Sequence, residues 1–394
     1  MAATFTEEML DFLVSPAGRD AVKQAEQLDP NRPSDVAKLR KVCAAAEARA
    51  VLELVELRGR GKQKFSRADR MYFDRVGYEQ SSDEVSAGYK ARRMERNASS
   101  GPVLDLCCGI GGDTIALAAG QEVWAVEGSR LRVRMTDLNL RAYERRKSAR
   151  LVCGNVRDIK LIGGAFHLDP DRRARGKRGL RLEDLEPGVD FVNELLAAIP
   201  SGVIKLSPAV EYKELPWPGE LEMISVAGEC KQLLVWTGVF VESRLRATVL
   251  PEGASLTEEG EGRYEVSPVG RYVYDPDPAV TRLRLLPQLA GKCELDFLAP
   301  GQIVLTCDER ISTPFATCYE VEEVSPFHQA KLHKHLQDRA VGAVAIKPRG
   351  LKVDVDELSQ ALSGRSGPPR VVFLLRLERK VVAVVARRVK GTAG

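Results

Sequence analysis

The chain has 394 residues, of which 44% are hydrophobic and 29% are charged, and its net charge at pH 7 is +4. This length indicates two or three domains, and the composition excludes a chain that is disordered throughout. A transmembrane protein is also excluded, because no apolar run approaches the ~20 residues that span a bilayer.

Residues 4–65 are expected to be helical, because apolar residues recur at three- and four-residue spacings from Val36 to Leu54. Ser34 precedes this run and is expected to cap its first turn. We therefore predict a mainly helical N-terminal domain over residues 1–97.

The most informative stretch begins with an apolar strand, Val103–Cys108, which runs into the glycine turn Gly109–Gly112. A helical segment follows, and then a second apolar strand that ends in Glu127. Glycines between a strand and a helix let the backbone approach a ligand, and an acid about 20 residues further on suits ribose hydroxyls. The pattern predicts a nucleoside-binding βαβ unit.

The details of the turn separate two classes of nucleotide cofactor. A G-x-G-x-x-G dinucleotide fingerprint from Gly109 needs a glycine where Thr114 stands, so a nicotinamide dehydrogenase is disfavoured. The sequence D-L-x-C-G-x-G-G-D from Asp105 to Asp113 instead resembles the first motif of class I methyltransferases that use S-adenosylmethionine. The resemblance implies that Asp105 organises the loop around the amino-acid end of this cofactor and that Glu127 binds its ribose.

Strands and helices alternate from about residue 102 to residue 240, which predicts an α/β fold with a largely parallel, doubly wound, Rossmann-like sheet. Residues 98–245 are the expected S-adenosylmethionine-binding domain. Ligands of such sheets bind beyond the carboxyl ends of the strands. The expected strands are 103–108, 122–127, 150–153, 165–169, 202–206, 222–226 and 232–237.

The third strand is followed by a turn at which the methyltransferase class carries an Asp or Asn facing the adenine amine. Asn155 is the first candidate for this role and Asp158 the second, and the alternative is a polar turn residue. The expected cofactor-binding residues are Asp105, Cys107, Gly109, Gly111, Asp113, Glu127, Asn155 and Asp158.

The fourth strand ends in Asp169-Pro170-Asp171-Arg172. Amino-directed nucleic-acid methyltransferases carry Asn/Asp-Pro-Pro and an aromatic residue at this place, so Asp171 and Arg172 depart from the geometry usual for amine methylation. Asp169 remains the candidate to accept a proton from the target group or to orient it. Lys205, at the tip of the fifth strand, is the second catalytic candidate or, alternatively, a surface lysine.

Basic residues concentrate directly after this fourth strand. They could neutralise substrate phosphates, or they could be solubilising surface charge. The expected substrate-binding residues are Arg172, Arg173, Arg175, Lys177 and Arg178. His167 lies inside the apolar strand and is expected to be a core histidine.

Residues 246–276 are rich in glycine, proline and charge, and we expect hairpins or a linker there. The pattern then changes to a second α/β domain, residues 277–394, which has no glycine-rich cofactor turn. Its expected strands are 303–307, 317–324, 341–346, 371–377 and 381–387, and its expected helices lie near 278–290, 327–339 and 354–363.

The chain carries DLCCGIGGD, LDPDRR, KLSP and GECKQLLVW in this order, with YEQSSDEVSAGYKARRM upstream and YDPDPAVTR and IKPRGLKVD downstream. In this combination it resembles a bacterial group of class I methyltransferases with a C-terminal THUMP-like domain, distantly similar to cap-trimethylguanosine synthases. The resemblance implies S-adenosylmethionine as the cofactor. Because THUMP domains are associated with RNA modification, it also implies RNA as the partner.

Two other functions stay open at this point. The acceptor could be a protein side chain or a small metabolite, or the chain could be a non-catalytic RNA-binding adaptor with a vestigial cofactor fold. The eight cysteines are scattered without a CxxC pair, which argues against a zinc site. Reduced thiols of this kind are typical of a cytoplasmic protein, which is the expected location.

Overall fold

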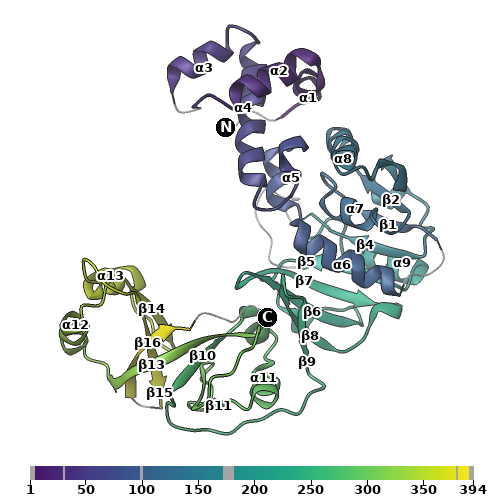
Figure 1. Cartoon of the computed structure of the whole chain (residues 1–394). Coiled ribbons are helices and arrows are strands. Elements are labelled where there is room, and N and C mark those ends of the chain that lie inside the picture. Colours follow the sequence, from purple (N-terminus) through teal and green to yellow (C-terminus); the bar gives the residue numbers. More distant parts are fainter. Residues whose placement is uncertain (1–4, 30–31, 98–100, 172–181, 379, 390–394) are drawn as a thin grey trace. The chain divides into compact units, whose positions relative to one another are not determined.

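The computed structural model describes residues 5–29, 32–97, 101–171, 182–378 and 380–389. The chain forms two compact units, each described by itself below (Figure 1). One unit comprises residues 1–219 and 233–242, and the other comprises residues 220–232 and 243–394. In the part of the chain that the structure describes, no helix is long and apolar enough to cross a membrane. The basic residues expected to bind substrate lie outside the described residues, namely Arg172, Arg173, Arg175, Lys177 and Arg178.

The N-terminal part of the first unit is helical, as predicted. The prediction for Ser34 was wrong, because its helix already begins at Pro33 and Arg32 is the N-cap. Proline suits the first helical position, since the N–H that it lacks has no partner there. The helices are α1 (Glu7–Val14), α2 (Pro16–Ala25), α3 (Pro33–Leu39), α4 (Ala45–Gly61), α5 (Arg75–Gln80) and α6 (Glu84–Arg96).

The sheet of the first unit has the strand order β3-β2-β1-β4-β5-β7. The first five strands are parallel, as predicted, and β7 runs antiparallel to β5. The strands are β1 (Val103–Leu106), β2 (Val123–Glu127), β3 (Ala149–Cys153), β4 (Ala165–Leu168), β5 (Gly202–Leu206) and β7 (Glu229–Thr237). The accompanying helices are α7 (Gly112–Leu117), α8 (Arg130–Ala142) and α9 (Val189–Ala198).

The second unit holds β6 (Glu220–Val226), β8 (Leu245–Leu250) and β9 (Ala254–Thr257), in which β8 and β9 form an antiparallel hairpin as expected. A separate seven-stranded sheet has the order β11-β12-β10-β13-β16-β15-β14. Its strands are β10 (Tyr272–Pro276), β11 (Asp296–Phe297), β12 (Leu305–Cys307), β13 (Ala316–Pro326), β14 (Val344–Arg349), β15 (Arg370–Leu377) and β16 (Lys380–Arg388). Its helices are α10 (Pro278–Arg282), α11 (Leu286–Cys293), α12 (Gln329–Asp338) and α13 (Val355–Leu362).

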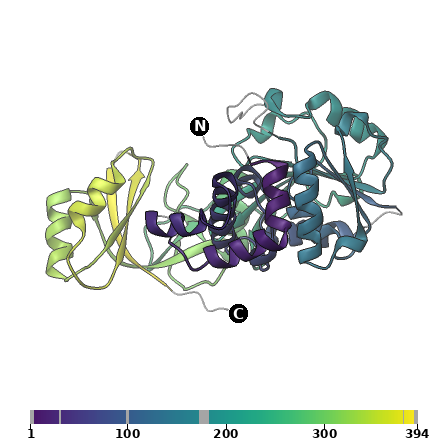
Figure 2. The same cartoon turned by 90° about the horizontal axis from the view of Figure 1, so that it is seen from above.

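The seven-stranded sheet has two apolar faces, because successive side chains of a strand point to opposite sides. Val372 and Leu374 of β15 belong to the core that α12 and α13 cover, and Figure 2 shows both helices on one side of the strands. Phe373 and Leu375 belong to a second core on the other face. The continuous apolar run in β15 is therefore a strand that is buried on both sides.

Candidate functional site

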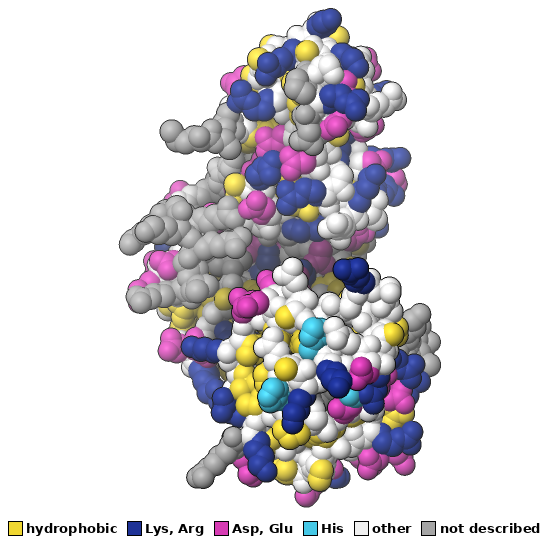
Figure 3. All heavy atoms as spheres, turned by 90° about the vertical axis from the view of Figure 1, so that its left-hand side faces the viewer, with side chains coloured by type: hydrophobic (Ala, Val, Ile, Leu, Met, Phe, Trp, Pro, Cys, Tyr) yellow, Lys and Arg dark blue, Asp and Glu magenta, His cyan; other side chains and the backbone are white. Residues whose placement is uncertain are grey.

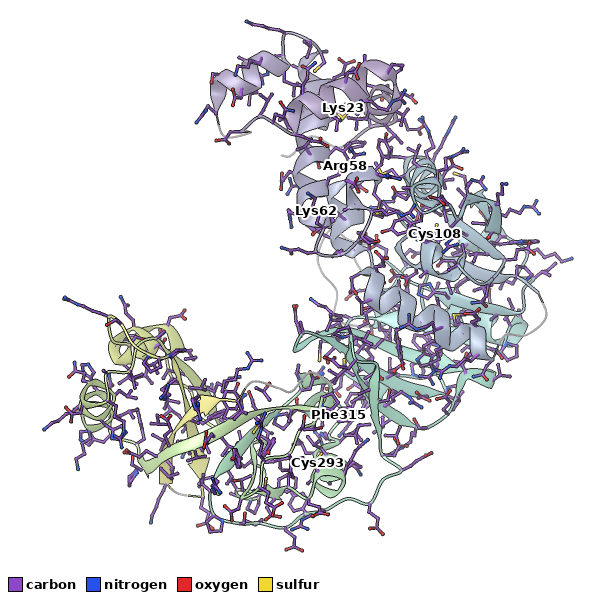
Figure 4. The ribbon with its side chains drawn as sticks, in the orientation of Figure 1. Lys23, Arg58, Lys62, Cys108, Cys293 and Phe315 are labelled. Atoms are coloured by element: carbon purple, nitrogen blue, oxygen red, sulfur yellow. The ribbon has the colours of Figure 1, made fainter. Side chains whose placement is uncertain are left out.

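The turn between β1 and α7 contains residues with a positive backbone φ, in the left-handed region. Cys108, labelled in Figure 4, marks its position. Gly109 has a φ of 57°, and a Cβ added to it would meet no atom within 4 Å, so this glycine faces open space. Gly111 has a φ of 86°, and a Cβ there would lie 2.8 Å from the side chain of Thr136 on α8. Gly109 thus keeps the space above the loop open, whereas Gly111 lets the loop pack on α8.

Glu127 closes β2 and holds this loop in place. Its Oε2 accepts a hydrogen bond from the Gly109 N–H at 3.0 Å, and its Oε1 accepts one from the Ser129 N–H at 2.8 Å. Burial raises the pKa of the Glu127 carboxyl, while the bonds from these two N–H groups and the charge of Arg132 act in the opposite direction. Each oxygen of this carboxylate accepts one hydrogen bond from a backbone N–H, so each still has a lone pair that can accept a hydrogen bond from a ligand hydroxyl.

Asp105 is fully buried beneath the loop. It accepts a hydrogen bond from Thr114 Oγ1 at 2.5 Å, and it lies 2.9 Å from Nδ1 of His167, its neighbour in the register of β1 and β4. Asp105 therefore fixes the first turn of α7, through Thr114, to strands β1 and β4. His167 is buried, as expected for a core histidine.

A buried lysine from α6 extends this arrangement. Lys90 Nζ lies 2.7 Å from Asp113 Oδ1, 3.2 Å from His167 Nε2 and 3.3 Å from Ser82 Oγ. An ammonium group only donates, so His167 Nε2 accepts and its Nδ1–H donates to Asp105. His167 is thereby assigned as a neutral ring, and we call Lys90, Asp113, His167 and Asp105 the buried ionic cluster.

Charge pairing controls protonation in this cluster. Burial lowers the pKa of Lys90, and the carboxylate of Asp113 opposes that effect. Burial alone would raise the pKa of Asp113, but the charges around it, that of Lys90 first, hold this pKa below its ordinary value. Ser82 Oγ also donates to Asp113 Oδ2 at 2.7 Å. The pair therefore stays charged, with each partner necessary for the other.

The ends of β4 and β5 carry a second ion pair. Lys205 Nζ donates to Asp169 Oδ2 at 2.6 Å and to the backbone oxygen of Gln80 at 3.3 Å. The Gln80 side chain donates through Nε2 to Asp171 Oδ1 at 2.9 Å. Asp171 and Glu186 exchange two backbone hydrogen bonds of 2.8 and 2.9 Å, which fix the backbone at Asp171.

The glycine turn, Glu127, Gln80, Asp169 and Asp171 line one cavity of about 160 Å³. At one end it is lined by Gly109, Glu127, Gly128 and Arg132, which we call the cofactor end. Beyond the turn, towards β4, it is lined by Gln80, Asp169, Pro170 and Asp171, which we call the acceptor end. Since β2 and β4 lie on either side of β1, a ligand placed across the β1 turn would touch both ends.

The structure places one of the other predicted site residues in the cavity wall and two outside it. Cys107 lines the cavity, and burial strongly raises the pKa of its thiol, so it is a neutral neighbour of the ligand space. Asn155 caps a short turn through an N–H bond from Arg157 and is exposed, and Asp158 is exposed as well. Neither of these two lines the cavity. Contact of Asn155 or Asp158 with an adenine stays a prediction.

Sequence reasoning missed Lys90, Ser82 and Gln80, all in a segment that precedes β1. One signal was present for Lys90. The buried positions of α6 are Ser86, Ala87, Lys90, Ala91, Arg93 and Met94, spaced as one helical face. A lysine inside such a stripe requires a buried partner. Within the described ranges, no group of three or more His, Cys, Asp and Glu side chains is arranged to hold a metal ion.

Comparisons with known proteins agree with this geometry. Residues 100–208 match the model of the RNA cap guanine-N2 methyltransferase family, and residues 316–388 match that of THUMP domain-like proteins. Residues 7–61 match a domain of unknown function. The first two matches place a methyltransferase domain in the first unit and a THUMP-like domain in the second.

Relatives extend the similarity over most of the chain. An uncharacterised S-adenosylmethionine-dependent methyltransferase, found in two strains of Mycobacterium tuberculosis, is 28% identical over 305 residues, which are 75% of this chain and 82% of the relative. The crystal structure of a putative methyltransferase from Porphyromonas gingivalis W83 has a TM-score of 0.75 at 22% identity. It covers 98% of this chain and 100% of that chain, so the two share a fold.

Proposed function

We propose that this S-adenosylmethionine-dependent methyltransferase transfers the methyl group to RNA. The observation that carries the proposal is the single cavity that joins the open glycine turn to the Asp169–Lys205 ion pair. Two family likenesses support RNA as the acceptor, one to RNA cap guanine-N2 methyltransferases and one to THUMP-like domains.

The residues present fit S-adenosylmethionine. The open face of Gly109 leaves room for a ligand against the backbone, and Glu127 offers carboxylate lone pairs for ribose hydroxyls. The buried ionic cluster holds the first turn of α7 behind the glycine turn. When bound, this cofactor supplies a methyl group on a positively charged sulfur, which is already activated for transfer.

The protein therefore has to align the attacking group, and such positioning is worth ~7–11 kcal/mol of a barrier. Asp169 is the residue that we assign to this task. Lys205 fixes its Oδ2, so Oδ1 is the atom that accepts a hydrogen bond from the attacking N–H or O–H. This bond turns the lone pair of the attacking atom towards the cofactor.

The THUMP-like unit offers a basic surface for the RNA backbone. Lys331 and Lys334 of α12, and His328 before it, are exposed. In Figure 3 the histidines of this unit, in cyan, have basic side chains in dark blue beside them, on a surface that also carries hydrophobic side chains in yellow and acidic ones in magenta. The basic residues Lys347 and Arg349 are less suited, because each lies 2.6 Å from the buried carboxylate of Asp275. We therefore assign phosphate contacts to α12.

The test has two stages, of which the first is calorimetric titration with S-adenosylmethionine, its demethylated product and NAD. Micromolar binding of the first two, without binding of NAD, is the expected result. Gly109→Asn serves as the control, since asparagine tolerates a left-handed φ and its side chain would occupy the open space. Gly111→Val is less suitable, because it would strike Thr136 and destabilise the fold.

The second stage follows transfer of labelled methyl groups in an extract of total RNA and protein. Label that ribonuclease removes supports an RNA acceptor, whereas label that resists ribonuclease and is removed by protease supports a protein acceptor. Binding of RNA without transfer to any acceptor, and without effect of the cofactor, would make the chain a binding adaptor.

A further inference from the structure

The acceptor end lacks two groups that amino-directed nucleic-acid methyltransferases place after the aspartate, a second proline and an aromatic ring, since Asp171 and Arg172 stand there. The structure brings a different residue to this place. Gln80, from a segment that none of the family matches covers, lines the same cavity as Asp169, Pro170 and Asp171.

We propose that Gln80 is a specificity-determining residue whose side-chain amide hydrogen-bonds to the polar edge of the acceptor base. The proposal rests on the proposed function, because it places an RNA nucleotide at the acceptor end. Gln80 is the last residue of α5, and it is held at two points. Its backbone oxygen accepts from Lys205, the partner of Asp169, and its side chain donates to Asp171.

The second contact fixes which way the amide faces. An ionised carboxylate only accepts hydrogen bonds, so the nitrogen of the amide must face Asp171 and the oxygen must face away from it. One N–H is used by Asp171 at 2.9 Å. The second N–H and the two lone pairs of Oε1 form a donor–acceptor pair, which is the pattern with which glutamine recognises a base edge.

The charges around Gln80 favour a base over a phosphate. Lys205 compensates the carboxylate of Asp169, and Asp171 faces an amide. A phosphate next to Asp169 and Asp171 would meet two carboxylates, whereas a base edge with N–H donors would find acceptors in both. Adenine, guanine and cytosine carry an exocyclic amine whose two N–H groups can donate to both carboxylates, whereas uracil offers a single imide N–H. The acceptor end is therefore better suited to the first three bases than to uracil.

The test is equilibrium binding of AMP, GMP, CMP and UMP to the full-length protein saturated with S-adenosylhomocysteine. We expect saturable binding of at least one of the first three and weaker binding of UMP. Gln80→Ala should weaken the binding of the preferred nucleotide about 10-fold, as expected when a bidentate hydrogen-bonding group is removed. It should leave the affinity for S-adenosylmethionine unchanged. Gln24→Ala, an exposed glutamine on α2, is the matched control and should change neither affinity.

A structural role is separated from recognition by a second variant and by kinetics. Gln80→Met keeps the length of the side chain and removes the amide. If Gln80→Ala lowers the unfolding temperature, nucleotide binding by Gln80→Met shows whether the amide itself is needed for recognition. With RNA as substrate, loss of recognition should raise KM more than it lowers kcat. Gln80→Glu should be worse than Gln80→Met, because it places a carboxylate against Asp171.

The outcomes separate this proposal from the proposed function. If Gln80→Met methylates RNA with unchanged KM and binds nucleotides normally, the role of Gln80 is overturned and RNA methylation stands. If nucleotides bind and Gln80→Met loses them, but RNA is never methylated, the recognition site stands and the function is wrong. If the wild type binds no mononucleotide and transfers methyl to protein, both fall.

Discussion

The two ends of the cavity are held by different kinds of contact. At the cofactor end, Glu127 is fixed by backbone N–H groups of Gly109 and Ser129, which are 18 and 2 residues away in the chain. At the acceptor end the contacts join distant parts of the chain, since Lys205 donates to the Gln80 backbone oxygen and the Gln80–Asp171 side-chain bond joins residues 91 positions apart. The first end is thus a local backbone motif, and the second depends on the tertiary fold. Substitutions should therefore separate the binding of cofactor from its use.

Removing Lys90 should have the largest effect, because the buried ionic cluster fixes the first turn of α7 and so supports the cofactor turn. Lys90→Met leaves the Asp113 carboxylate buried without its cation, which costs ~3–5 kcal/mol in buried pairs. Denaturant unfolding should show that loss in the free energy of unfolding, and calorimetry should show no cofactor binding. Lys62→Met is the control, since Lys62 is exposed after α4 (Figure 4).

The double variant Lys90→Met/Asp113→Leu sharpens this prediction. It removes both charges, so most of the lost stability should return. If the single variant is as stable as the wild type, Asp113 is not paired as described.

Asp169→Ala should separate methyl transfer from cofactor binding most clearly. The change removes the acceptor for the attacking group, so kcat should fall by at least ~100-fold, a typical size for loss of a proton-handling side chain. The affinity for S-adenosylmethionine should stay within about twofold, because every group at the cofactor end is kept. Rapid-quench transfer and calorimetry measure the two quantities. Equal decreases in both would mean that the ends are not separable.

Glu127→Gln should weaken the binding of S-adenosylmethionine about 10-fold, as expected when hydrogen bonds to a charged group become neutral ones.

Burial raises the pKa of Glu127 above its ordinary value of 4.5, so the folded protein keeps this proton at a higher pH than the unfolded chain. Its contribution to stability therefore decreases as the pH rises from 4.5 through the raised pKa.

Cofactor affinity should show the opposite trend, because ribose hydroxyls prefer the ionised carboxylate. In the wild type the affinity should fall on acidification, and the fall should begin above pH 4.5. Calorimetry from pH 7.5 to pH 5 is the measurement. The Glu127→Gln variant should bind weakly and without this pH dependence, and a parallel fall in the variant would assign the effect to another group.

The smallest effect is expected in the second unit, on the basic surface of α12. Lys331→Ala/Lys334→Ala should weaken RNA binding a few-fold and reduce the slope of log K against log salt by ~0.7 for each phosphate that is no longer neutralised. Filter binding at several salt concentrations measures both. Lys41→Ala, at an exposed site in the N-terminal region, should change neither quantity. An unchanged slope in the double variant would remove α12 from the RNA interface.

Sequence alone predicted the elements whose pattern is local. The run near 354–363 was expected as a helix and is α13, and the apolar strands of both sheets lie where the runs indicated them. The strand β10 was missed, because it lies in a stretch dominated by glycine, proline and charge. Glu127 could be proposed since its motif is continuous in the chain. Gln80 could not, because a glutamine at a helix end is typical of the surface until its distant partner is known. For Lys90 the buried stripe of α6 indicated burial, but its partners Asp113 and His167 are distant in the chain.

The way in which Glu127 is held has a consequence for how such proteins diverge. Its partner Ser129 offers a main-chain N–H, which every amino acid except proline supplies, so that residue can be replaced over many generations without loss of the methyl donor, whereas Gly109 has to keep the ligand space open. The residues that meet the acceptor come from separate stretches of the chain, before β1 and after β4. Descendants of one ancestral protein can thus acquire new substrates by changes in those stretches while they inherit the same chemistry.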